Sequence, residues 1–208
     1  MIVVIDYGVG NLYSVEKALK FVGGEVKVTS SAADLKNSDK LVLPGVGAFG
    51  DCMKNLASTG LIPTILEQVL LHKPLLGICV GLQILFESSE ESPNVKGLGI
   101  FKGEIKKIRA GNLKIPHMGW NSIEIGRKNN LIKFGASKIF AGLEGKNYFY
   151  FVHSYHAAPS NADIVTATTD YGEKVTAAVE LGNIFATQFH PEKSGDVGLK
   201  VLKNFVEL

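Results

Sequence analysis

The sequence predicts an α/β protein: a doubly wound, mostly parallel sheet with flanking helices and extra β-strands in the C-terminal half. In the first half of the chain, short apolar runs alternate with segments of helical period, which is typical of parallel strands covered by helices on both faces. After Gly97 the helical segments give way to short β-type runs joined by Gly-containing turns. The length of 208 residues suits one hydrophobic core. We therefore expect a single domain over residues 1–208.

Apolar spacing predicts the elements of the first half. Residues 2–6 form an apolar run that predicts a buried first strand, and a turn follows at Gly8 and Gly10. Leu12, Val15 and Leu19 recur at helical spacing and predict a helix over residues 11–22. The same criteria predict strands at residues 25–29, 40–43 and 75–78, and helices at residues 51–56, 62–71 and 80–86.

The second half is richer in β patterns. Residues 103–109 have apolar residues three apart instead of alternating, and we still expect a strand there. The segment from Ile115 to Asn121, which holds His117, is expected to form a turn with Trp120 as its aromatic anchor. Clearer strand patterns lie at residues 148–152, 164–169, 175–181 and 184–188, and residues 197–208 predict a closing helix.

Composition excludes several classes of function. Lys and Arg number 22 against 20 Asp and Glu, so we expect neither nucleic-acid binding nor a polybasic membrane patch. No stretch approaches the roughly 18 apolar residues of a membrane helix, and the apolar N-terminus lacks the charged leader of a signal peptide. The chain has two cysteines, Cys52 and Cys79, which favours a reducing compartment over a disulfide scaffold. We therefore expect a cytoplasmic protein.

Cys79 lies in the segment most informative about chemistry. A predicted strand runs into a predicted helix through Gly77-Ile78-Cys79-Val80-Gly81, the thiol counterpart of the nucleophile elbow. A sharp turn of this kind needs small residues on both sides, because larger side chains would collide with neighbouring backbone. The helix that follows points free N–H groups at the sulfur, which favours the thiolate, and the Val80 amide is placed to donate to an oxyanion. A buried structural cysteine is the competing interpretation.

His190 and Glu192 follow the last predicted strand. His190 begins a loop, from which a neutral imidazole could take the proton of Cys79. Glu192, two residues later, could accept a hydrogen bond from the other ring nitrogen and so fix the tautomer. Taken alone, His-Pro-Glu equally suits a turn with an incidental histidine. The catalytic interpretation of His190 and Glu192 therefore depends on the presence of Cys79 at the elbow.

A glycine-rich loop from Gly45 to Gly50 follows another strand and satisfies Gly-x-Gly-x-x-Gly. A dinucleotide-binding oxidoreductase is therefore an alternative. Against it, Pro44 opens the turn, the match is not on the first strand, and Glu67 lies inside a helical pattern instead of ending the next strand. We favour a loop in which Gly45, Val46 and Gly47 present backbone N–H groups to an oxyanion. A plain tight turn stays open.

Other candidates would line the same site. Gln83 lies one helical turn after Cys79, so both face the same way, although a helical glutamine is often only solvated. His153, in the run His153-Ser154-Tyr155 after a predicted strand, could line the site or be a satisfied core histidine. No His/Cys cluster has metal-ligand spacing, so we expect no metal. We expect no other cofactor.

Residues 77–81 together with residues 190–192 resemble the class I glutamine amidotransferases, whose glutaminase domain is a doubly wound α/β fold. The segments that resemble, more closely, the glutaminase subunits of imidazole glycerol phosphate synthase are residues 6–11, 44–47, 86–90, 116–121 and 190–195. The resemblance covers the whole chain.

The resemblance implies a role for each matching residue. Cys79 would attack the carboxamide of glutamine, His190 would shuttle protons, Glu192 would orient His190, and Gln83 would contact substrate. The oxyanion strand falls on Gly45 to Gly47, where one peptide must turn an N–H inward for activity. The surface facing the synthase would include Asn11, Trp120 and Lys193. Ammonia would enter a separate (β/α)₈ cyclase subunit in histidine biosynthesis.

Two departures from the family pattern are Val80, where Leu is commoner, and His156, where an aromatic residue is usual; neither is a triad position. Two further alternatives stay open at this stage. One is a paralogous glutaminase that feeds a different synthase, such as a sugar-modifying amidotransferase. The other is a catalytically silent binding subunit, which the presence of all three triad residue types disfavours.

Overall fold

The computed structural model describes residues 1–126 and 137–208. The helices are α1 (Leu12–Phe21), α2 (Ala32–Asn37), α3 (Phe49–Ser58), α4 (Ile62–Leu70), α5 (Val80–Gln83) and α6 (Gly195–Val206). Three single turns of 3₁₀ helix are η1 (Lys138–Phe140), η2 (Ala162–Ile164) and η3 (Pro191–Lys193). The strands of the larger sheet are β1 (Ile2–Ile5), β2 (Val26–Thr29), β3 (Lys40–Gly45), β4 (Leu75–Cys79), β7 (His117–Ile125), β8 (Asn147–His153), β10 (Val165–Asp170), β11 (Lys174–Leu181) and β12 (Ile184–Thr187). A smaller sheet holds β5 (Ser88–Ser89), β6 (Gly103–Lys107) and β9 (Tyr155–Pro159).

The larger sheet has the order β2-β1-β3-β4-β12-β11-β10-β7-β8. Its first five strands pair in parallel, and the remaining pairings are antiparallel. The expected parallel half and the extra C-terminal strands are therefore confirmed. β4 lies between β3 and β12, with Gly45 opposite Cys79 and Thr187 opposite Ile78. The loops that follow these three strands consequently meet at one edge of the sheet, which is where open α/β sheets bind ligands.

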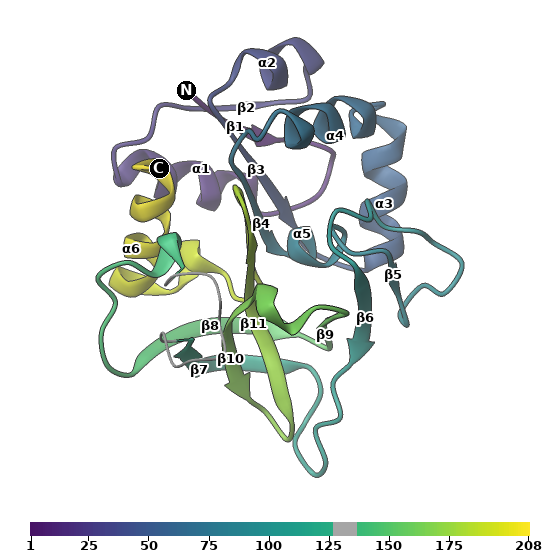
Figure 1. The fold of residues 1–208 in the computed structure, drawn as a ribbon, viewed down its shortest axis with the longest axis vertical. Helices are drawn as coiled ribbons and strands as arrows, with labels where there is room; N and C mark the ends of the chain where they lie inside the picture. Colours follow the sequence, from purple (N-terminus) through teal and green to yellow (C-terminus); the bar gives the residue numbers. More distant parts are fainter. Residues whose placement is uncertain (127–136) are drawn as a thin grey trace.

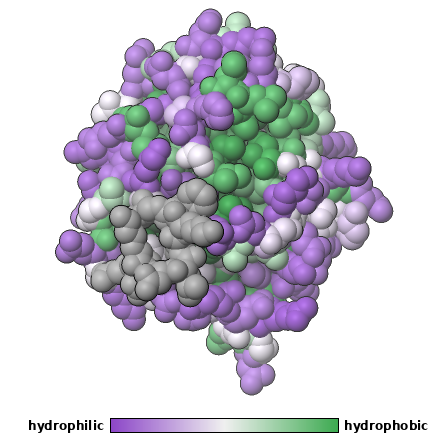
Figure 2. All heavy atoms as spheres, viewed as in Figure 1, coloured by the Kyte–Doolittle hydropathy of each residue, from purple (hydrophilic) through white to green (hydrophobic). Residues whose placement is uncertain are grey.

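Helices cover both faces of the parallel half. In Figure 1, α1 and α6 lie on one side of β1, β3 and β4, and α3 and α4 lie on the other. Burial on both faces explains why β1 reads Ile-Val-Val-Ile with every residue buried. Helix α1 buries Val15, Ala18 and Leu19, the face predicted from helical spacing. Figure 2 shows hydrophobic residues gathered over the upper half of one face, in the region of α3, α4 and β4.

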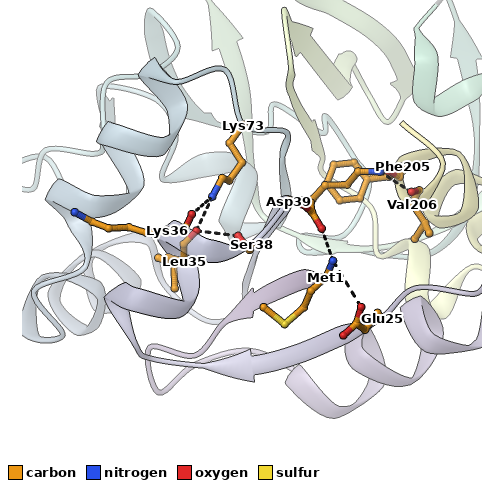
Figure 3. Close-up of polar contacts among 10 residues, drawn as sticks. Met1, Glu25, Leu35, Lys36, Ser38, Asp39, Lys73, Phe205 and Val206 are labelled. Atoms are coloured by element: carbon orange, nitrogen blue, oxygen red, sulfur yellow. Dashed lines mark hydrogen bonds and ion pairs between the residues drawn. The ribbon is translucent and has the colours of Figure 1, made fainter.

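Two lysines fix the C-terminal ends of helices to the sheet. The ammonium of Lys73, just before β4, donates to the carbonyl oxygens of Leu35 and Lys36 at 2.8 Å each, at the end of α2 (Figure 3). Lys40, at the start of β3, donates to the last carbonyls of α6, those of Phe205 and Val206. The last turn of a helix leaves its carbonyls without intrahelical partners, so cations stabilise both ends.

The expected turn from Ile115 to Asn121 was wrong, because its residues from His117 onward open β7. They pair with β8 over a regular antiparallel register that begins at His117 opposite His153. Pro116 and Gly119, whose φ is +124°, are of residue types common in turns, which led to the wrong prediction. Pairing with β8 outweighs this local preference. The helix after Cys79 is also shorter than predicted and ends at Gln83. Within the residues that the structure describes, no helix is long and apolar enough to cross a membrane.

Candidate active site

Cys79 occupies a strained turn between β4 and α5. Its φ of +56° and ψ of −112° lie outside the usual regions for a side-chain-bearing residue. Such a conformation costs on the order of 1–3 kcal/mol and persists only where the surroundings enforce it. The strain places the thiol at the first turn of α5, where the backbone N–H groups have no intrahelical acceptor. The sequence-based prediction of an elbow is thus confirmed in its backbone geometry.

The neighbouring glycines permit the close approach that enforces this turn. A Cβ on Gly81 would lie 1.9 Å from the carbonyl oxygen of Leu43, and one on Gly77 would lie 2.9 Å from that of Gly81. A Cβ on Gly45 would lie 2.6 Å from the Gly81 nitrogen. Glycine at position 45 is therefore required by packing of β3 against the elbow. Gly45, the first glycine of the motif that suggested a dinucleotide-binding loop, therefore has a different structural explanation.

A cavity opens beside the sulfur at the carboxyl edge of β4. It brings together residues from the loop after β3, the elbow with α5, the β8–β9 junction and the loop after β12. The lining residues are Val46, Gly47, Cys79, Val80, Gln83, Glu91, Pro116, Val152, His153, Ser154, Tyr155 and His190. These include every residue predicted for substrate binding and three of the four predicted for the oxyanion. The fourth, Gly45, lies behind the wall against Gly81.

Glu192 lies behind His190, on the side away from this lining. Its Oε1 is 2.8 Å from His190 Nδ1, and the two side chains are 1% and 2% exposed. Because the carboxylate only accepts, Nδ1 carries the proton and Nε2 is the ring atom left for the cavity. Burial lowers the pKa of His190, but the adjacent Cys79 sulfur and Glu192 carboxylate outweigh it and raise that pKa to about 10. The geometry suits a thiolate–imidazolium pair.

Two carbonyl groups, one near the end of β3 and one in the loop after it, are held by residues that do not line the cavity. Tyr7 donates its hydroxyl to the Pro44 carbonyl at 2.6 Å, and the Cys52 thiol donates to the Val46 carbonyl at 3.4 Å. The N–H and C=O of a trans peptide point in opposite directions, so the Gly47 N–H points away from Cys52. Gly47 has a φ of +93°, a conformation that suits glycine.

A hydrogen-bonded network supports the opposite wall. The Tyr155 carbonyl accepts from His153 Nδ1 at 2.8 Å, and His153 Nε2 lies 3.0 Å from His117 Nδ1. Asn121 Nδ2 then lies 3.2 Å from His117 Nε2. Because a carbonyl only accepts, the whole series is oriented: each histidine donates from Nδ1 and accepts at Nε2. Burial lowers the pKa of His117 to about 4 and that of His153 to about 3, so both rings are neutral near pH 7.

Glu91 is a cavity residue that the sequence interpretation missed. Its Oε2 accepts the Phe49 N–H at 2.7 Å, and its side chain contributes a carboxylate to the lining. The residue directly follows the segment 86–90 that resembled the family. That adjacency was the available signal, but no spacing rule ties a carboxylate twelve positions after the cysteine to the same cavity.

The predicted interface residues lie outside this cavity. Trp120 is 57% exposed and meets Tyr150 edge-on, with ring centroids 6.3 Å apart. The Lys193 ammonium lies 5.9 Å from the same ring, and the Tyr150 ring is in turn 6.5 Å from that of His190. Asn11 precedes α1, which packs against η3. Among residues 1–126 and 137–208, no group of three or more His, Cys, Asp or Glu could hold a metal ion.

Fold and site together define a class: an α/β protein with a cysteine at a nucleophile elbow and a buried His–Glu pair beside it. A family model, glutamine amidotransferase class-I, matches residues 3–208. A solved glutamine amidotransferase superimposes with a TM-score of 0.75 at 19% identity and full coverage of both chains. PurLQS from Thermotoga maritima gives a TM-score of 0.74 at 21% identity, covering 99% of this chain and 97% of that one.

The relatives found by sequence similarity identify a narrower family than the solved structures do. Imidazole glycerol phosphate synthase subunit HisH of Methanothermobacter thermautotrophicus is 52% identical over all of this chain and 98% of its own length. The subunits of the same name from Methanocaldococcus jannaschii and Aquifex aeolicus are 47% and 49% identical, the former over the full length of both chains and the latter over 98% of this chain and 94% of its own. The chain therefore belongs to the class-I glutamine amidotransferases and, within them, to the HisH subunit family.

Proposed function

We propose that this chain is the glutaminase subunit of imidazole glycerol phosphate synthase, acting in the cytoplasm to hydrolyse glutamine and pass the ammonia to a cyclase subunit. The observation that carries the proposal is the meeting of Cys79 and His190 in one cavity, with Glu192 buried behind the imidazole. Subunits of that name that are 52% and 48% identical over the whole of this chain support the choice of pathway.

The first half-reaction breaks the C–N bond of the carboxamide. The Cys79 thiolate attacks the carbonyl carbon, and the oxygen takes up negative charge beside the N–H groups of Gly47 and Val80. His190 Nε2 then protonates the nitrogen, ammonia leaves, and a thioester remains. Glu192 keeps Nδ1 protonated, so that Nε2 is the atom that gives and takes the proton.

The second half-reaction restores the cysteine. His190, now neutral, takes a proton from water, whose oxygen attacks the thioester carbon. The C–S bond breaks, glutamate leaves, and the sulfur is again a thiolate beside imidazolium. Atoms balance as glutamine plus water giving glutamate plus ammonia.

The remaining lining residues suit recognition of an amino acid. Glu91 supplies a carboxylate for the substrate α-ammonium group. Gln83, Ser154 and Tyr155 supply polar groups for the carboxylate and carboxamide, and neutral His153 adds no competing charge. Charge and shape together favour glutamine over an uncharged amide.

The (β/α)₈ cyclase subunit would dock over Trp120, Lys193 and Asn11. Ammonia released into water at neutral pH protonates and loses its nucleophilicity, so a sheltered exit is required. Trp120 and Lys193 are exposed and both contact the half-buried Tyr150, whose ring centroid is 6.5 Å from that of His190. Exposed aromatic residues such as Trp120 are typical of interface centres.

Docking would also act on the loop of Gly45, Val46 and Gly47. Glycines on both sides let the intervening peptide rotate at little steric cost. A partner can shift that equilibrium only by binding one loop state more tightly. In the structure the Val46 carbonyl accepts from Cys52, so the idle state would be the one in which this peptide has rotated and its carbonyl faces the cavity. The loss of one oxyanion donor costs about 10²–10³ in rate elsewhere, so a free subunit that is mostly in the rotated state would be nearly idle.

The test is glutamate release from glutamine by the chain alone, with the cyclase, and with the cyclase plus its nucleotide ligand. We expect slow turnover alone and a rise of roughly 10²-fold or more with both additions. Equal turnover in all three would overturn the loop switch but keep the glutaminase. Absence of turnover in all three would overturn the proposed function.

A further inference from the structure

Gln188 is a buried glutamine that the triad chemistry leaves without a role. It follows β12, is 0% exposed, and its backbone N–H bonds the Ala177 carbonyl at 2.8 Å. Its side-chain Nε2 lies 3.8 Å from Cys79 Sγ, and its Oε1 accepts from Gln83 Nε2 at 3.2 Å. The β12–β4 pairing brings it there, since Thr187 lies opposite Ile78.

The orientation of the Gln188 side-chain amide is fixed by Gln83 and Tyr155. Gln83 Nε2 also donates to the Tyr155 carbonyl at 3.1 Å, and a carbonyl only accepts. The nitrogen end of Gln83 must therefore face both Tyr155 and Gln188. Gln188 in turn must offer its oxygen to Gln83, which leaves its N–H₂ group facing the sulfur. The Tyr155 carbonyl of β9 thus orients Gln188 so that a donor, and not an acceptor, faces Cys79.

We infer that Gln188 is a catalytic residue that stabilises the Cys79 thiolate by direct hydrogen bonding; this rests on the proposed role of Cys79 as nucleophile. A thiolate only 3% exposed to solvent has lost most of its water and needs donors in place of it. The Gln188 amide supplies one without adding charge. The donor is needed before the attack and again when the C–S bond breaks and the thiolate re-forms.

A packing role alone does not account for a glutamine here. A buried amide costs free energy unless its polar atoms are bonded, and an apolar side chain of the same size would fill the space without that cost. Both ends of the Gln188 amide are used, one on Gln83 and one on Cys79.

The test measures the rate of Cys79 alkylation by iodoacetamide against pH, followed on the Cys79 peptide by mass spectrometry. The full chain is compared with Gln188→Met, which keeps the length and removes the donor, and with Gln188→Glu, which puts an anion at the same place. Gln68→Met, a buried glutamine on α4 outside the cavity, is the matched control.

We expect the midpoint of the alkylation profile to rise by about one pH unit in Gln188→Met, the low end for a hydrogen bond to a charged group. Gln188→Glu should raise it further, and Gln68→Met should leave it unchanged. An unchanged midpoint in Gln188→Met would overturn the inference. Should Gln188→Met fail to fold, Gln188→Leu, which also lacks the donor and adds no charge, decides in its place. Because alkylation needs no glutamine turnover, a negative result here is separate from failure of the proposed function.

Discussion

His190 Nδ1 and Glu192 Oε1 are 2.8 Å apart, and together they form an almost wholly buried pair. Glu192→Gln keeps the shape but removes the charge that holds the tautomer and stabilises imidazolium. The analogous change in the serine triad costs about 10⁴ in turnover, and a thiolate depends less on its base. We therefore expect a loss on the order of 10–10³ in glutaminase turnover of the complex.

Glu67→Gln on α4, where the carboxylate is half exposed and pairs with Lys36, is the matched control and should retain full turnover. Full activity of Glu192→Gln would remove Glu192 from the mechanism.

The closest approach of two segments in the site also gives a stability prediction. Gly81→Ala places a Cβ 1.9 Å from the Leu43 carbonyl, and neither the strained elbow nor central strand β3 can move aside. We expect a loss of unfolding free energy at or above the upper end of the roughly 1–3 kcal/mol typical of overpacking, measured by urea denaturation. Gly182→Ala, in a turn with open space around it, should lose only about 1 kcal/mol for its positive φ. Equal losses would show that the close approach is not limiting.

Which features the sequence could predict depends on whether their cause is local. The elbow, its glycines and the strands around it can be predicted from short-range patterns. The strain at Cys79 and the period of the strands both depend on residues that are adjacent in the sequence. The register of β7 against β8 is not local: His117 becomes a strand residue because β8 pairs with it. Likewise Gln188 and Glu91 reach the cavity only through sheet order and a loop path, which no spacing in the sequence specifies.

The paired histidines predict how stability depends on pH. The folded-state pKa values of His117 and His153, about 4 and about 3, lie below the ordinary value of 6.5. Between those values the unfolded chain binds more protons than the folded chain. The stability contribution is thus complete above about pH 6.5 and is lost as pH falls through that window. Each neutral histidine contributes a slope approaching about 1.4 kcal/mol per pH unit.

His117→Gln removes one of these titrating groups. Between pH 6 and 4.5 we expect the unfolding free energy of the variant to fall less steeply than that of the parent. The difference in slope should correspond to about one fewer proton taken up on unfolding. Urea titrations at several pH values measure the slope. Parallel pH profiles would mean that His117 titrates normally in the folded state.

Cys79 is proposed to make the ammonia that the partner consumes. The most direct measurement is product formation by the Cys79→Ala subunit bound to the cyclase, with glutamine or with ammonium salt as nitrogen source. A glutamine-analogue alkylator run on the parent chain shows which cysteine reacts. Burial raises the pKa of Cys52 to about 11, so Cys52 stays a thiol and Cys79 alone should be labelled. We expect Cys79→Ala to abolish glutamine-driven synthesis and to keep ammonium-driven synthesis at the parent rate. Glutamine-driven synthesis that survives in Cys79→Ala, or labelling of Cys52 alone, would contradict it.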